Sequence, residues 1–240
     1  RGAMNKILAH SKRTELTGVI TASAGNHAQG VSVAAQAAGI PATVIMPLWS
    51  SLSKQEASRG YGADVHLYGQ TLEESMNRAM ELASDEMLYV HPFDDPEIIA
   101  GQGKIGLEIC DDLPSPDIIV VPVGGGGLVS GISVAVKNRV PSCKIIGVQA
   151  DACPFAYLSK YGNDGVRIKN EWTLADGIRV TRPGTHTLPY LREMVDKIVL
   201  VDDGEISDAM LWLLERKKIV AEGAGATPLA ALLSGKFSFP

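Results

Sequence analysis

The sequence predicts an α/β fold, with mainly parallel twisted sheets that carry helices on both faces. Short β-branched runs alternate with longer helical stretches along almost all of the 240 residues. The run from Ile118 to Val121 is continuously apolar, which is typical of a strand covered on both faces. Because strands and helices alternate, right-handed crossovers are expected to join parallel strands.

Seven segments have the composition and spacing of strands. In chain order they cover residues 18–21, 42–47, 64–68, 88–92, 117–123, 144–150 and 197–201. Helical spacing is clearest in residues 26–38, 72–83, 98–110 and 204–217. The acidic pairs at 94–95 and 202–203 are predicted to start helices. A Pro-containing stretch at 91–96 is expected to mark the passage between two lobes, which should pack together around a cleft because no flexible linker separates them.

Composition and charge limit the classes of function. The chain is 45% apolar and 20% charged, which is ordinary for a globular protein, and its net charge of −5 offers no basic surface to nucleic acid. No apolar run reaches the ~18 residues of a membrane span, so neither nucleic acid nor membrane is an expected partner. Three cysteines, Cys110, Cys143 and Cys153, are too few for a disulfide framework and are predicted to be buried thiols. A cytoplasmic location fits this composition.

A glycine run follows the fifth predicted strand. Four glycines, Gly124 to Gly127, precede an apolar helix that is expected to begin near Leu128. Consecutive glycines let the backbone turn tightly and bring several N–H groups to one anion, and the helix adds the positive end of its dipole. The run fits neither a Gly-x-Gly-x-x-Gly dinucleotide motif nor a P-loop. It favours a phosphate site, with a ligand-free strand-to-helix turn as the alternative.

A second polar turn, from Thr21 to Gly30, also lies between a predicted strand and a predicted helix. Ser23 and Asn26 are residue types that cap helix N-termini. Taken alone, the segment is therefore equally compatible with a simple helix start that has His27 on its first turn.

Five segments taken together resemble the fold-type II pyridoxal-phosphate (PLP) enzymes, in the branch of threonine/serine dehydratases (threonine ammonia-lyases) and serine racemases. They are 23–30 continued by 39–47, then 96–103, 124–127, 173–177 and 222–226. The resemblance covers essentially the whole chain. It implies a small lobe over 17–94, a large incomplete lobe made of 1–16 plus 95–240, PLP in the cleft, truncation at both ends and a homo-oligomer.

The resemblance also implies the roles of particular residues. Asn26 would hydrogen-bond the 3′-oxygen of PLP, while Ser23, Gly25 and His27 would surround the substrate carboxylate. The backbone that would hold the cofactor phosphate belongs to Gly124, Gly125, Gly126, Gly127 and Leu128.

Two further cofactor contacts and a lysine complete this implied site. Gly177 would lie beside the cofactor through its backbone, and Glu222 near the ring or the substrate amino group. The Schiff-base lysine of the family lies in a Ser-Phe-Lys-x-Arg-Gly-Ala motif. Since this chain begins Arg1-Gly2-Ala3, that lysine is expected two positions before Arg1, and no catalytic residue is assigned within the chain. Lys6 falls past the motif and is interpreted as a solvated helix residue.

The implied reaction is dehydration and deamination of L-threonine and/or L-serine to a 2-oxo acid and ammonia by β-elimination. Racemase-type relatives carry a serine before Gly-Asn-His, where this chain has Ala24, which has no proton to donate. They also bind a divalent cation where this chain has Gln149 and Phe155, and a neutral amide is a poor replacement for a carboxylate. The sequence thus favours elimination and predicts no metal site, with nearby Asp151 interpreted as a solvated loop acid.

Two alternatives stay open at this point. The same fold could serve a serine or aspartate racemase or a hydroxyaspartate dehydratase. The absence of the lysine from the chain motivates a second alternative, a non-catalytic cofactor-binding relative. The sequence does not separate a preference for threonine from one for serine.

Overall fold

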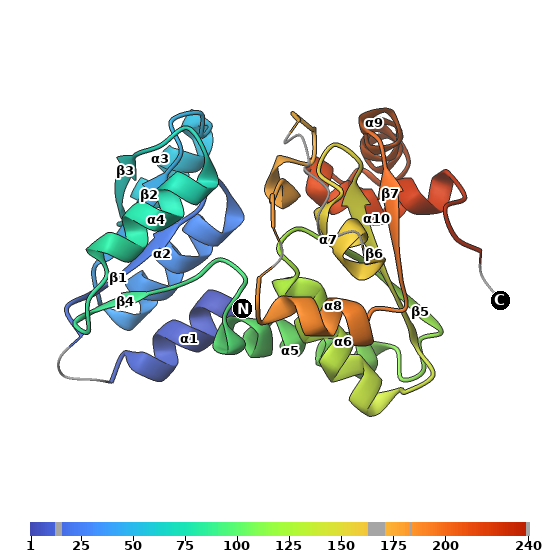
Figure 1. The fold of residues 1–240 in the computed structure, drawn as a ribbon, viewed down its shortest axis with the longest axis horizontal. Helices are drawn as coiled ribbons and strands as arrows, with labels where there is room; N and C mark the ends of the chain where they lie inside the picture. The colour runs from blue at the N-terminus through green and yellow to red at the C-terminus, as the bar shows by residue number, and fades with distance from the viewer. Residues whose placement is uncertain (13–15, 163–170, 183, 239–240) are drawn as a thin grey trace. The chain divides into compact units, whose positions relative to one another are not determined.

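The computed structural model describes residues 1–12, 16–162, 171–182 and 184–238. The chain divides into two compact units, Arg1–Gly101 and Gln102–Pro240, each with its own sheet (Figure 1). The predicted lobes, 17–94 and 1–16 plus 95–240, stay a prediction. In the structure the first helix lies in the first unit, because Ala3 and Ile7 share a hydrophobic core with Val31.

The elements alternate along the chain as predicted. In order they are α1 (Gly2–His10), β1 (Gly18–Ala22), α2 (Asn26–Ala38), β2 (Ala42–Met46), α3 (Leu52–Gly60), β3 (Asp64–Leu67), α4 (Leu72–Leu82), β4 (Met87–Tyr89), α5 (Pro96–Asp112), β5 (Ile118–Pro122), α6 (Gly127–Arg139), β6 (Lys144–Ala150), α7 (Phe155–Lys160), the 3₁₀-helix η1 (Asp176–Ile178), α8 (Thr187–Glu193), β7 (Lys197–Val201), α9 (Asp203–Trp212), the π-helix η2 (Leu213–Lys217) and α10 (Gly223–Leu233). All seven predicted strands are present. The largest shift is at β4, which was predicted to end at residue 92 and ends at Tyr89.

The first unit is built on a four-stranded parallel sheet in the order β3-β2-β1-β4. Val19 on β1 and Val44 on β2 face a core shared with α1 and α2. Ile20 and Ile45 point to the opposite face, where Ala79 of α4 covers them. The strands are therefore buried on both sides, which fixes the carboxyl end of β1 and with it the turn that follows Ala22.

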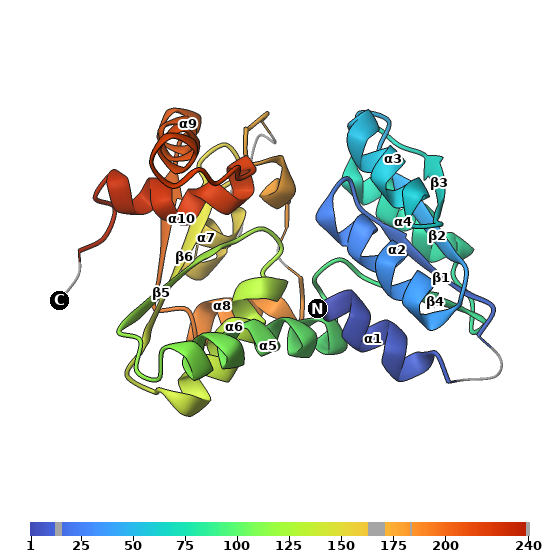
Figure 2. The same ribbon diagram turned by 180° about the vertical axis from the view of Figure 1, so that it is seen from behind.

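The second unit has a three-stranded parallel sheet in the order β5-β6-β7, seen from the opposite side in Figure 2. Val121 and Ile145 belong to a core that includes residues of α6, α7 and α8. Val148 and Val199 belong to the core formed with α9 and α10. Helices therefore cover both faces of this sheet, which confirms the fold class. The glycine run follows the carboxyl end of β5, the edge at which open α/β sheets bind ligands.

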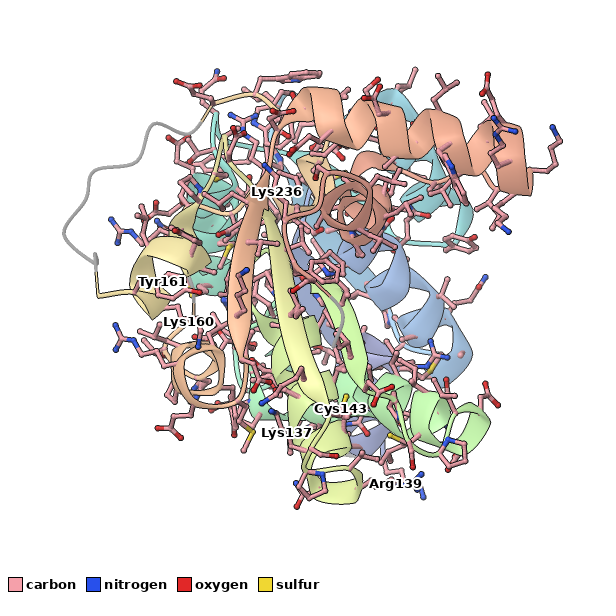
Figure 3. All side chains as sticks on the ribbon, turned by 90° about the vertical axis from the view of Figure 1, so that its right-hand side faces the viewer. Lys137, Arg139, Cys143, Lys160, Tyr161 and Lys236 are labelled. Carbon is pink, nitrogen blue, oxygen red and sulfur yellow. The ribbon has the colours of Figure 1, made fainter. Side chains whose placement is uncertain are left out.

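The free edge of β7 is covered by one side chain. The hydroxyl of Tyr161, just after α7, accepts a hydrogen bond from the amide of Ile198 at 3.3 Å and lies 3.5 Å from its carbonyl oxygen (Figure 3). Beside it, the ammonium of Lys160 donates to the carbonyls of Leu191 and Arg192 near the end of α8. The Tyr161 contacts occupy backbone groups of β7 that would otherwise be open to pairing.

Both acidic helix starts are confirmed. Asp95 accepts hydrogen bonds from the amides of Glu97 at 2.8 Å and Ile98 at 3.2 Å at the start of α5. Asp202 and Glu205 form a reciprocal capping box on α9. These acids therefore satisfy helix N–H groups, as the sequence predicts.

The interpretation of Lys6 as a solvated residue is wrong. Lys6 is buried and forms an ion pair with Asp95, whose other carboxylate oxygen caps α5. The ammonium lowers the pKa of Asp95 against the opposing effect of burial. The prediction that the three cysteine thiols are buried is confirmed.

Lys218 has a backbone conformation that favours glycine. It follows the π-helix with φ of 59°, in the left-handed region. We expect Lys218→Gly to raise the free energy of unfolding by about 0.5 kcal/mol, because relief of the side-chain clash slightly exceeds the entropy that glycine adds to the unfolded chain. Urea unfolding measures this change. Lys217→Gly, at the adjacent helical position, is the control and should lower stability; equal effects of the two would contradict the expectation.

Candidate functional site

The glycine run forms a tight turn between β5 and α6 that only glycine fits. Gly126 is the N-cap of α6 and has φ of 96°. A Cβ atom on Gly126 would lie 2.9 Å from Cβ of Thr187, and one on Gly124 would lie 3.1 Å from Cα of Ile178. The predicted tight turn is confirmed, and because glycine has no side chain, the backbone is the chemistry that this segment offers.

The amides of this turn suit an anion. Within the part of the chain that the structure describes, the amides from Gly124 to Leu128 have no protein acceptor, and no side chain caps α6. The amide of Ser130 is the first beyond the turn to bond within the protein, to the carbonyl of Gly126 at 2.9 Å. Free amides at the start of a 13-residue helix are the donors that a phosphate group needs, so the turn fits a phosphorylated cofactor.

Thr187, at the start of α8, hydrogen-bonds the backbone of this turn. Its fully buried hydroxyl donates to the carbonyl of Gly125 at 2.7 Å and accepts from the amide of Gly184 at 3.0 Å. Sequence reasoning missed this residue. The contact joins residues 62 positions apart, and no local pattern around Thr187 signals it.

The other two sequence motifs of the second unit lie against the glycine turn. Ile178, which contacts Gly124, directly follows Gly177 in η1. A Cβ on Gly177 would lie 3.9 Å from Oε1 of Glu222, the N-cap of α10. Gly223 approaches Leu174 so closely that a Cβ there would lie 2.2 Å from the Leu174 carbonyl oxygen. The structure thus brings Gly124, Gly177 and Glu222 into one neighbourhood.

Asp203 fixes the segment that carries Gly177. One carboxylate oxygen of Asp203 accepts from the hydroxyl of Thr173 at 2.6 Å and from the amide of Leu174 at 3.0 Å. Thr173 is buried, and its hydroxyl also accepts from the amide of Ala175. Asp203 was predicted only to start a helix. Its contacts with Thr173 and Leu174 give it a second role, in positioning this segment, which the sequence did not indicate.

The turn after β1 is not capped by the side chains that suggested a cap. The N-cap of α2 is Gly25, without a side-chain hydrogen bond to the helix, and Asn26 is an exposed first helical residue. The buried hydroxyl of Ser23 accepts from the amide of Gly25 at 3.1 Å, while the amide of Ser23 donates to the carbonyl of Ile45. Ser23 therefore shapes the turn. The helix does begin here with His27 on its first turn, as the helix-start alternative expects, but the N-cap is Gly25 and no side chain caps the helix.

His27 is held neutral beside the same turn. Its Nε2 lies 3.2 Å from the carbonyl oxygen of Val90, which also accepts from the hydroxyl of Thr21 at 2.7 Å. Because a carbonyl only accepts, Nε2 carries the proton and donates it. Burial lowers the pKa of His27 to about 4, with the carbonyl contact opposing and nearby His91 adding to the shift. The imidazole therefore brings no charge at neutral pH.

This lowered pKa predicts acid sensitivity. An unfolded histidine binds a proton below about pH 6.5, whereas folded His27 stays neutral to about pH 4. Stability is therefore complete above pH 6.5 and falls as pH drops toward 4, by about 2–3 kcal/mol from this residue. Urea unfolding between pH 4 and pH 8 measures it. We expect His27→Gln to flatten the dependence and the exposed-site control His66→Gln to keep it; equal slopes in all three proteins would contradict the assignment.

Gln149 lies where racemase-type relatives are expected to bind a divalent cation, and its side-chain amide is hydrogen-bonded within the protein. Gln149 is fully buried, and its Oε1 accepts from the amide of Tyr157 at 3.0 Å, which ties β6 to α7. Asp151 is exposed on the loop, as predicted, and Phe155 begins α7. Among the described residues, no cluster of three or more His, Cys, Asp or Glu side chains is arranged to hold a metal ion.

Comparison with known proteins decides the family. The family model for pyridoxal-phosphate dependent enzymes matches residues 1–238. The chain belongs to this family. The family cofactor, pyridoxal phosphate, carries the phosphate that the glycine turn fits.

Members of the PLP enzyme family with known names and structures resemble the chain over nearly all of its length. An L-threonine ammonia-lyase from Thermotoga maritima is 49% identical over 98% of this chain and 59% of its own length. One from Geobacter sulfurreducens is 47% identical over 98% of this chain and 58% of its own. The chain thus spans less than two thirds of the length of these relatives.

Solved structures agree on the fold. The processed form of threonine deaminase isoform 2 from Solanum lycopersicum is 40% identical and superposes with a TM-score of 0.88 over 96% of this chain and 67% of its own. Maize serine racemase is 34% identical, with a TM-score of 0.92 over 98% of this chain and 72% of its own. Within the described residues, no helix has both the length and the apolar character that a membrane span requires.

Proposed function

We propose that the whole protein is a PLP-dependent ammonia-lyase that converts L-threonine and/or L-serine to a 2-oxo acid and ammonia by β-elimination. The observation that carries this proposal is the sequence identity of 49% and 47% to two L-threonine ammonia-lyases over nearly the whole chain. The glycine turn, with its free amides, supports a phosphorylated cofactor independently of that similarity.

The residues of the second unit are proposed to hold the cofactor. The amides of Gly124, Gly125, Gly126, Gly127 and Leu128 would donate to its phosphate. The backbone of Gly177 would lie beside the cofactor. A side chain at this position would instead approach Glu222. Glu222 would approach the ring or the substrate amino group from the start of α10.

The turn after β1 is proposed to hold the substrate carboxylate and the 3′-oxygen of the cofactor. Asn26 is exposed at the first position of α2 and would donate to that oxygen. Ser23 and Gly25 would offer the shaped backbone of the turn. His27 would contribute mainly its backbone, since its Nε2 proton is used on Val90 and its ring is neutral.

The chemistry depends on a group outside this chain and on the cofactor. We propose that a lysine two positions before Arg1 removes the α-proton of the substrate. When bound, PLP supplies an electron sink for the charge that this proton leaves behind. The chain's own part is to orient both molecules and to hold their anionic groups with preorganised amides, so that the α-proton faces its base.

Assay of the full-length protein tests the function. L-threonine should yield 2-oxobutanoate and ammonia, and L-serine should yield the corresponding 2-oxo acid. Absence of any 2-oxo acid from either substrate, in protein that has bound its cofactor, would refute the proposal.

Racemisation is the second candidate, because maize serine racemase shares the fold with a TM-score of 0.92. Ala24, which offers no hydroxyl for protonation of the opposite face, argues against it. Chiral analysis of the residual serine separates the two reactions: unchanged stereochemistry removes the racemase. A homo-oligomeric state and a cytoplasmic location stay predictions, and sedimentation of the full-length protein tests the first.

A further inference from the structure

Three side chains of the N-terminal helix α1 contact the start of α5. The side-chain amide of Asn5 donates to the carbonyl of Glu97 at 2.8 Å. Lys6 forms its ion pair with Asp95. Nε2 of His10 lies 2.9 Å and 3.1 Å from the two carboxylate oxygens of Glu97. The polar contacts of α1 with α5 are thus gathered on the short segment from Asp95 to Glu97.

The first turn of α1 also meets α5 through its backbone. A Cβ atom on Gly101 would lie 2.7 Å from Cα of Gly2 and 3.1 Å from the carbonyl oxygen of Arg1. A Cβ atom on Gly2 would lie 2.9 Å from the carbonyl oxygen of Ile98. Both glycines are buried. The beginning of α1 therefore lies closer to the backbone of α5 than larger residues at these positions would allow.

The Lys6–Asp95 pair is better suited to fix the position of α1 than to stabilise it. Its two side chains are only 11% and 13% exposed, and the desolvation of a buried ion pair offsets much of its attraction. Ala3 and Ile7 already bury the apolar face of α1 in the core. Apolar contacts have no preferred direction. The ion pair does, because Asp95 is itself bonded to two amides at the start of α5.

We propose that Lys6 and Asp95 position the lysine that the proposed function places two residues before Arg1. Two residues span at most about 7 Å, so the backbone of that lysine follows any shift of the first turn of α1. The inference rests on the proposed function, because that function assigns the lysine. Lys6 and Asp95 are positioning residues, which act through α1 and take no part in removal of the α-proton.

Asp95→Asn in the full-length protein tests the inference. Asparagine keeps the size of the side chain and can still accept the two α5 amides, while the charge that holds Lys6 is lost. PLP is added to cofactor-free protein, and the lysine amine forms a bond to the aldehyde carbon as water leaves. Borohydride then reduces this bond at timed intervals, and mass spectrometry counts the protein that carries the cofactor covalently.

The expected result is slower attachment without weaker binding. We expect the rate of covalent attachment to fall about 10- to 100-fold in Asp95→Asn, because a misplacement of about 1 Å can slow a reaction by that much. Pyridoxamine phosphate, which has no aldehyde, should bind with an unchanged dissociation constant. A merely structural role of Asp95 would weaken pyridoxamine phosphate binding together with attachment.

Asp196→Asn, in the second unit, is the matched control. Asp196 also pairs with a partly buried lysine, Lys137, at 2.6 Å (Figure 3), and also accepts a backbone amide, that of Ile145 at 2.8 Å. None of these partners belongs to α1. The control should therefore keep the attachment rate of the unaltered protein, even where urea unfolding shows that it loses as much stability as Asp95→Asn.

Asn5→Ala covers the case in which Asp95→Asn does not fold. Asn5 is exposed, and its replacement removes only the bond to the carbonyl of Glu97. Attachment should slow by about 3- to 10-fold, the size of one ordinary hydrogen bond. If Asp95→Asn attaches PLP as fast as Asp196→Asn, or Asn5→Ala as fast as the unaltered protein, the inference is wrong while the ammonia-lyase function stands. An unaltered full-length protein that attaches no PLP and makes no 2-oxo acid would overturn both.

Discussion

Gly223→Ala is expected to destabilise the protein by about 3 kcal/mol. The added Cβ would lie 2.2 Å from the carbonyl oxygen of Leu174 and 3.0 Å from the amide nitrogen of Ala175, both of which are backbone atoms. A flexible side chain could turn away, but a backbone segment that Asp203 holds through Thr173 can give way only by breaking those bonds. Urea unfolding of the full-length protein without cofactor measures the loss.

Gly225→Ala is the matched control for this substitution. It lies two residues further along α10, is exposed, and a Cβ there meets no atom within 4 Å. Alanine also has the higher helix propensity, so this variant should be as stable as the unaltered protein or slightly more stable. If both variants lose the same stability, the close approach of Gly223 to Leu174 is not what holds these two segments together.

The sequence could predict those parts of the fold and site that depend on near neighbours. The strand pattern around Ile118–Val121 and the glycine run after it need only local sterics, and the structure confirms the turn at Gly126 with its positive φ. The capping box of Asp202 and Glu205 likewise depends on residues three positions apart. In each case the residue type and the spacing contain the whole physical cause.

Contacts between distant residues could not be predicted in this way. The burial of Lys6 depends on Asp95, 89 positions away, and exposed lysines are so common that a solvated side chain was the reasonable expectation. Thr187 is an ordinary helix-start residue until the fold sets its hydroxyl against Gly125. The resemblance to a family could locate motifs, but the charges that surround them required coordinates, as the neutral His27 shows.

The second large effect is expected for Gly126→Ala, which should weaken binding of the cofactor phosphate. The residue has φ of 96°, which costs a non-glycine residue about 1–2 kcal/mol. Its Cβ would also lie 2.9 Å from Cβ of Thr187 and 3.1 Å from Cδ1 of Leu191. The turn must therefore shift, and the amides from Gly124 to Leu128 lose their common direction. Loss of one such bond to a charged phosphate raises the dissociation constant of PLP about 10- to 100-fold.

Comparison of two ligands isolates the phosphate contribution to this effect. Titration of the full-length protein with PLP and with pyridoxal, which lacks the phosphate, should show a large loss for PLP and almost none for pyridoxal. Gly60→Ala, at the end of α3 where a Cβ meets no atom within 4 Å, controls for the same change of residue and should bind both ligands normally. An equal loss for both ligands in Gly126→Ala would mean that the substitution disturbs the protein as a whole. The glycine turn would then have to be regarded as a packing feature of β5 and α6, and the phosphate would have to be sought elsewhere.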